Sequence, residues 1–228
     1  MSSEELLVLT LAPNNPSNTI ITSATGDVVY TVVTEHTKTT TTTQILNAQE
    51  EVVASSEWRD VLPDKITIGN NKPISLGDWM KRSLVPFKDD ISFTDNEGRK
   101  YKWRGNSAGR DFELYTADDK YASPIARFHR PRLIHVPLSL ESDPSPNDSA
   151  VSSTPTLINS KHRYPQTPAT LVLSSRAVQI QDTIVTSFLF LEKSHRINET
   201  EHQSRADVLG APDISVGVQY RATNGGVP

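Results

Sequence analysis

The stretch QDTIVTSFLFLEK, Gln181–Lys193, is the one long apolar run of this sequence. At 100° per residue, Ile184, Phe188 and Leu191 fall on one side of a helix and Val185 falls on another, so the segment is apolar on nearly all sides. Its apolar part is far shorter than the roughly 20 residues that cross a bilayer. We therefore predict a helix that is enclosed by protein.

A buried strand is the alternative for the same run, because Ile, Val, Thr and Phe all favour strands. The polar segment that follows, Glu192 to Glu199, continues without a turn signal. This continuation favours a helix over about residues 181–197.

The composition limits the classes of protein that this chain can represent. With 228 residues it is long enough for one domain with a core, but only 36% of them are hydrophobic, which suggests that part of the chain is unpacked. The net charge of −4 gives no general signal for nucleic acid. The absence of cysteine excludes disulfides, a cysteine nucleophile and thiolate metal ligands. The N-terminal residues resemble neither a signal peptide nor a spanning helix, so we expect an intracellular, cytoplasmic protein.

Most of the remaining chain alternates between short β-forming segments and turn residues, which predicts a meander of antiparallel hairpins. One turn, Asp95-Asn-Glu-Gly98, offers a glycine where a positive φ is needed. The segments predicted as strands are 6–11, 20–22, 27–36, 37–45, 50–58, 66–68 with short β pieces at Ile74 and Leu76, 91–94, 100–104, 112–116, 121–129 and 171–173.

Two regions differ from this pattern. Residues 140–168 are rich in Ser, Pro, Asn and Asp and have few large apolar groups, which is typical of a disordered insertion. Polarity rises again after the apolar helix, so residues 199–228 are interpreted as a flexible tail. We therefore place one domain at residues 5–198.

The order of several short motifs resembles a domain family of unknown function that is abundant in mushroom-forming fungi. The motifs are YTVVT (30–34), VASSEW (53–58), GDW (77–79), DNEGRKYKW (95–103), ELY (113–115), ARFH (126–129) and DTIVTSFLFLEK (182–193). That family is in turn similar to the tubby C-terminal superfamily. The resemblance implies a closed antiparallel β-barrel around a buried C-terminal α-helix, and it agrees with the need of a barrel for an apolar interior.

Motifs that carry catalysis are lacking in the sequence. It has no HExxH, no GxSxG, no P-loop and no GxGxxG, and its six histidines form no pair at helical spacing. We expect no catalytic residue, no metal and no cofactor. A non-enzymatic binding module is the resulting hypothesis.

Two clusters of cations are candidates for a binding site. In Lys100–Arg104, the strand period places Tyr101 and Trp103 on one face and the three basic side chains on the other. A second cluster follows near residue 130. Arginine and lysine on a rigid strand face suit phosphate groups. The candidate residues are Lys100, Lys102, Arg104, Arg127, Arg130 and Arg132.

Because the tubby superfamily includes phosphoinositide binders, the resemblance implies a phosphoinositide or another anionic membrane lipid as ligand, with the protein peripheral at the membrane. The simpler interpretation is a solvated face with cross-strand ion pairs to Glu113 or similar residues. A different hypothesis is a protein-interaction module that is regulated by phosphorylation of Ser145, Thr154 or Thr167, each of which precedes a proline. No nucleic-acid partner is expected.

Overall fold

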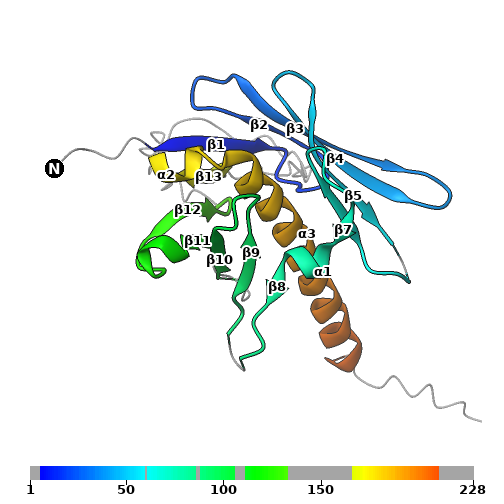
Figure 1. Cartoon of the computed structure of the whole chain (residues 1–228). Helices are drawn as coiled ribbons and strands as arrows, with labels where there is room; N and C mark the ends of the chain where they lie inside the picture. The colour runs from blue at the N-terminus through cyan, green and yellow to red at the C-terminus, as the bar shows by residue number, and fades with distance from the viewer. Residues whose placement is uncertain (1–5, 60, 86–87, 106–110, 133–165, 211–228) are drawn as a thin grey trace, which may run out of the picture.

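One large antiparallel sheet dominates the computed structural model (Figure 1), which describes residues 6–59, 61–85, 88–105, 111–132 and 166–210. Within these residues, thirteen strands lie in the order β7-β6-β5-β4-β3-β2-β1-β13-β12-β11-β10-β9-β8. Every neighbouring pair is antiparallel, and most neighbours follow one another in the chain. The predicted meander is therefore confirmed, with β13 inserted between β1 and β12.

The strands are β1 Leu7–Ala12, β2 Thr19–Thr22, β3 Val28–His36, β4 Thr41–Asn47, β5 Val52–Trp58, β6 Lys65–Ile68, β7 Ile74–Ser75, β8 Lys81–Arg82, β9 Ile91–Thr94, β10 Lys100–Arg104, β11 Glu113–Thr116, β12 Pro124–His129 and β13 Ala169–Leu173. The helices are α1 Leu76–Trp79, the 3-10 helix η1 Ala117–Asp119, α2 Ser175–Val178 and α3 Gln181–Gly210.

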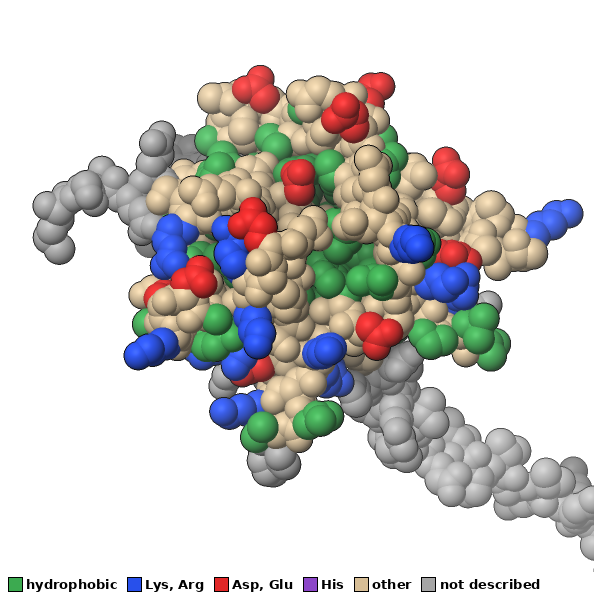
Figure 2. Space-filling model, in the orientation of Figure 1, with side chains coloured by type: hydrophobic (Ala, Val, Ile, Leu, Met, Phe, Trp, Pro, Cys, Tyr) green, Lys and Arg blue, Asp and Glu red, His purple; other side chains and the backbone are tan. Residues whose placement is uncertain are grey.

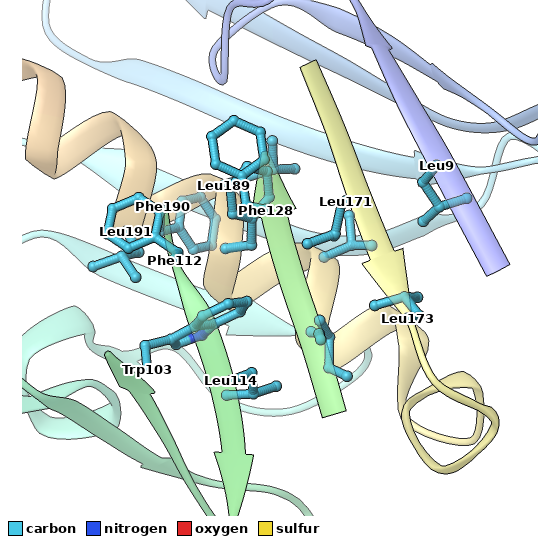
Figure 3. Packing of buried hydrophobic residues seen from close by; sticks show 14 of the residues in the cluster. Leu9, Trp103, Phe112, Leu114, Phe128, Leu171, Leu173, Leu189, Phe190 and Leu191 are labelled. Atoms are coloured by element: carbon cyan, nitrogen blue, oxygen red, sulfur yellow. The ribbon is translucent and has the colours of Figure 1, made fainter. Parts of the chain in front are cut away.

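The apolar run is the helix that the sequence predicts, and the sheet curves around it (Figure 1). Ile184, Val185, Phe188, Leu189 and Leu191 are all buried, although they point in different directions. Only an element with protein on every side can bury such a set. Figure 3 shows side chains of α3 packed beside those of β10, β11 and β12 and of the segment before β11.

A hydrogen bond in the interior fixes how α3 is rotated against the sheet. The indole Nε1 of Trp103 donates to Ser187 Oγ at 3.0 Å, and the hydroxyl donates to the carbonyl of Ile184 at 3.0 Å. Both polar side chains are fully buried, so the indole N–H of Trp103 would be left without this hydrogen-bond acceptor if Ser187 were absent. Phe188 also touches the ring of Trp103, with 6.3 Å between the ring centroids.

The prediction of a closed barrel is wrong. The sheet has two ends, β7 and β8, and these two strands do not pair with each other within the described residues. Each is only two residues long, and α1 joins them directly. A barrel needs a continuous ladder of staggered strands around its circumference, which these short strands cannot supply. The helix fills the interior instead, so the sheet only has to wrap around it.

The predicted bounds of the helix and the predicted core agree with the structure only in part. α3 continues to Gly210, beyond the end we predicted near residue 197. The sequence favours Asp182 as the N-cap of this helix, whereas the helix begins at Gln181 and Asp182 lies within its first turn. Trp58 is only partly buried against the core. The other residues that the sequence predicts to be in the core are all buried, and these are Phe93, Trp103, Leu114, Phe128, Ile184, Phe188 and Leu191. Most of the predicted insertion 140–168 and the tail beyond Gly210 lie outside the described residues.

Truncation of Phe188 tests the central position of α3. Because its ring is fully buried among Trp103 and Phe128, we expect Phe188→Ala to lower the free energy of unfolding by about 3–5 kcal/mol. Urea titration followed by circular dichroism measures this. Val28→Ala, at an exposed side chain, is the control and should change stability by less than about 0.5 kcal/mol. A Phe188 variant as stable as this control would contradict the enclosed helix.

Lys193 should make stability depend on pH. Its ammonium lies 3.4 Å from the ring centroid of Trp58, and burial lowers its pKa from 10.5 to about 8, against the opposing effect of Asp64. Between those two pH values the folded protein has released the proton that the unfolded chain still binds. Stability contributed by this residue therefore rises with pH across the window.

We expect the unfolding free energy of the wild type, minus that of Lys193→Met, to increase between about pH 7.5 and about pH 10. Urea titrations at both pH values measure the difference, and the methionine variant removes the contributions of all other groups. A difference that stays constant or decreases would contradict the lowered pKa.

Candidate functional site

Five cations gather on the outer face of the last strands of the sheet, which we call the basic strand face. Two rows of the strand register create it. Lys81 of β8 lies opposite Ser92 of β9, which lies opposite Lys102 of β10. Arg104 lies opposite Glu113 of β11, which lies opposite Arg127 of β12. The basic strand face consists of Lys81, Lys100, Lys102, Arg104 and Arg127.

The predicted division of β10 into two faces is confirmed. Tyr101 and Trp103 are buried, whereas Lys100 is exposed and Lys102 and Arg104 are half-buried. The rigid ladder on both sides holds the backbone of these cations in place. Figure 2 shows many Lys and Arg side chains on the lower left of the molecule, where Figure 1 has β8, β9 and β10.

Aromatic rings and carboxylates orient part of the basic strand face. The guanidinium of Arg104 lies 4.2 Å from the ring centroid of Tyr115. Lys102 Nζ lies 4.6 Å from the ring centroid of Tyr121 and 3.5 Å from Asp90 Oδ2. Such stacking keeps a cation accessible at one side while its stem is covered.

Glu113 is the carboxylate within the basic strand face. Its Oε1 lies 3.1 Å from Arg127 Nε, and its Oε2 accepts a hydrogen bond of 2.6 Å from the hydroxyl of Tyr115. The cross-strand ion pair that we considered as the simpler interpretation therefore exists. This ion pair does not neutralise the face. Among the described residues, the five cations form ion pairs with two carboxylates, Glu113 and Asp90. Within the described part of the chain, Lys81 and Lys100 form no ion pair.

The remaining two candidate residues lie elsewhere. Arg130 contacts α3: its guanidinium lies 3.5 Å from Glu192, 3.3 Å from Glu199 and 3.0 Å from His195 Nδ1. Arg132 pairs with Asp111 at 3.0 Å. The structure thus brings together four of the six predicted residues.

Lys81 belongs to the face and was missed by the sequence analysis. From the sequence alone, residues 76–84 are a possible helical turn packed on the core, whereas the helix ends at Trp79 and a short strand follows. Its place beside Lys102 depends on the pairing of β8 with β9. The hairpin spacing between the two segments was the only signal in the sequence.

A second region that could hold a ligand is an open cavity of about 1140 Å³ at the N-terminus of α3. The turns between β4 and β5, β6 and β7, and β9 and β10 line it. Its charged side chains are four carboxylates, Glu51, Asp95, Glu97 and Asp182, and one guanidinium, Arg99. Arg99 is already bound to Asp95 at 2.7 Å. A cavity with this excess of negative charge repels phosphate.

The wall of this cavity is tied together by Tyr30 of β3. Its hydroxyl donates to Asp182 Oδ1 and accepts from Gln181 Nε2 at 3.1 Å. Burial, together with the neighbouring Asp182 carboxylate, raises the pKa of Tyr30. The phenol therefore stays protonated and joins the start of α3 to the first half of the sheet.

Two further findings concern the described residues only. They include no group of His, Cys, Asp or Glu side chains that could hold a metal ion. None of their helices combines the length and the apolarity that crossing a bilayer requires.

Comparison with known families identifies the chain by its sequence. A family model described as a family of unknown function, DUF6593, matches residues 14–197. The chain belongs to this family. The matched segment reaches from the loop after β1 into α3, so it contains the basic strand face and the helix that the sheet encloses. DUF6593 thus describes nearly all of the fold reported above.

Comparison with solved structures finds an X-ray structure of a protein from Arabidopsis thaliana. The two chains are 11% identical, with a TM-score of 0.45, and the match covers 84% of this chain and 93% of the plant chain. No curated protein matches the sequence.

Proposed function

We propose that this chain is a non-enzymatic binding module whose basic strand face binds the phosphate groups of a phosphoinositide or another anionic membrane lipid. The observation that carries the proposal is the cross-strand register, which aligns cations from β8, β10 and β12 on one outer surface. Their backbone positions are fixed by the sheet. A site built on strands is held more precisely than one built on loops.

The chemistry of the basic strand face suits phosphate. Lys81 and Lys100 offer ammonium groups without an ion pair in the described part of the chain. Arg127 is more than half exposed, so its guanidinium can exchange part of its contact with Glu113 for a phosphate oxygen. Local attraction extends over a Debye length of about 10 Å, so the overall charge of −4 does not prevent it.

The proposal includes three further inferences, on the superfamily, the source and the cellular location of the protein. We infer a distant relationship to the tubby C-terminal superfamily, supported by an antiparallel sheet that curves around one apolar helix. We infer a fungal source, supported by the motif order quoted above. We also infer a cytoplasmic protein that is peripheral at the membrane, because an anionic headgroup is the proposed ligand.

Charge reversal tests the proposal. We expect Lys100→Glu/Lys102→Glu to abolish co-sedimentation with phosphatidylcholine vesicles that contain phosphatidylinositol 4,5-bisphosphate, because it places two carboxylates where phosphates should bind. The matched control is Lys38→Glu/Lys72→Glu, which changes the net charge equally at exposed positions outside the basic strand face. The control should pellet as the wild type does.

A second variant probes the same site in the opposite direction. Glu113→Gln removes the carboxylate that holds Arg127, so we expect it to pellet at a lower lipid fraction than the wild type. If the charge-reversed protein and its control pelleted equally, the cations of β10 would not be the binding site.

The alternative function is a protein-interaction module regulated by phosphorylation, and one described residue supports it. Thr167 is exposed two residues before β13 and precedes a proline, and its Oγ1 accepts from the backbone nitrogen of Arg132 at 2.9 Å. A phosphate there would lie close to the exposed guanidinium of Arg132. Ser145 and Thr154 lie outside the described residues.

Mass spectrometry of the protein purified from its native cells tests this alternative. We expect phosphate on Thr167 in a fraction of the molecules, and weaker partner capture by Thr167→Ala than by the wild type. Complete absence of phosphate from all three sites would contradict it.

A further inference from the structure

Two loops at one end of the molecule expose large apolar side chains. Leu84 and Val85, in the loop between β8 and β9, are 98% and 54% exposed. Val61 and Leu62, between β5 and β6, are 92% and 60% exposed. Single exposed apolar residues are ordinary on protein surfaces, but two pairs of adjacent exposed residues, each at the end of a loop, need an explanation.

The two loops border the gap where the sheet fails to close. A pocket of about 360 Å³ lies in this gap, and residues from the β5–β6 loop, from β8 and β9 and from α3 line it. Pro63 and Asp64 come from one side, Arg82 and Ile91 from the other, and Phe190 lies between them. The loops therefore lie on either side of one opening (Figure 1). Apolar side chains also protrude at the bottom and the lower right of Figure 2.

We propose that Val61, Leu62, Leu84 and Val85 insert into the interface of a lipid bilayer and so orient the molecule on the membrane. This inference rests on the proposed binding of anionic lipid and assigns a second, apolar contact to it. The four side chains are called the insertion tips below.

The shape of the insertion tips favours a bilayer over a protein partner. Apolar protein contacts bury an anchor in a fitted pocket of the partner, whereas these side chains stand out at separate loop ends with little protein around them. An interfacial element needs only to immerse its apolar groups to a depth of about 5–10 Å while its charged groups stay with the headgroups. Lys65 and Arg82 lie on the strands that adjoin the loops and are exposed, so their charged groups can stay with the headgroups.

The basic strand face and the insertion tips are continuous along the chain. Lys81 belongs to the face and starts the strand that leads to Leu84. The described residues of the two loops carry Arg59 and Lys88 beside the carboxylates Asp64, Asp89 and Asp90, so the attraction to anionic lipid comes from the face. The insertion tips add apolar contact after the phosphate groups are bound.

The lack of cysteine in the sequence allows a direct test. We would label Leu84→Cys and Val61→Cys separately with an environment-sensitive fluorophore and add phosphatidylcholine vesicles with phosphatidylinositol 4,5-bisphosphate. We expect a blue shift and a rise in intensity for both labels. Val28→Cys, about half exposed in the β2–β3 hairpin far from these loops (Figure 1), is the control and should not respond.

Affinity provides the second measurement. Leu84→Ser/Val85→Ser should weaken vesicle binding by about tenfold or more, because two apolar side chains lose their transfer from water. Ile20→Ser/Val28→Ser, at apolar side chains on β2 and β3 that are 45% and 46% exposed, should bind as the wild type. Urea midpoints equal to that of the wild type would show that both variants are folded.

The outcomes separate the inference from the function on which it rests. Pelleting that depends on Lys100 and Lys102, with no response of either label and no loss in the serine variant, overturns insertion and leaves lipid binding intact. No pelleting of the wild type contradicts both. A blue shift that needs no vesicles and grows with protein concentration overturns the inference in favour of contact between two copies of the chain.

Discussion

The burial of one apolar helical segment, Ile184–Leu191, is the constraint on which this fold depends. Its side chains point in all directions and all of them avoid water, so protein must surround the helix. The sheet meets this demand by curving, and the alternation of its strands turns one side chain in two toward α3. The other side chain of each pair faces outward. The same alternation that builds the core therefore also builds the basic strand face.

The helix makes closure of the sheet unnecessary. A barrel without a central element relies on a continuous ladder to exclude water, whereas here α3 supplies the interior and the sheet can end at β7 and β8. Those end strands are two residues long, which leaves little unpaired backbone for another chain to add to. The pocket beside α1 is the consequence of this arrangement.

Local pattern was sufficient to predict most strands, the turn at Gly98 with its positive φ, and the helix in preference to a buried strand. These features depend on neighbouring residues. Closure of the sheet depends on whether β7 pairs with β8. The composition of the basic strand face depends on Lys81 and Lys102, which lie on either side of Ser92. Both features are decided by pairing between separate segments, which local pattern does not show. Arg130 and Arg132 show the same limit. They are two residues apart in the sequence, but Arg130 pairs with carboxylates of α3 and Arg132 pairs with Asp111.

The position of α3 after all thirteen strands of the described residues has a consequence for synthesis in the cell. Residues up to β12 leave the ribosome before the helix that covers their inner faces exists. During that interval Tyr30, Ile45 and Trp103, all buried in the finished protein, have no helix to pack against, and such surfaces aggregate. The nascent chain is therefore most prone to aggregation until the helix emerges, and a product truncated before residue 181 lacks the segment that covers these side chains.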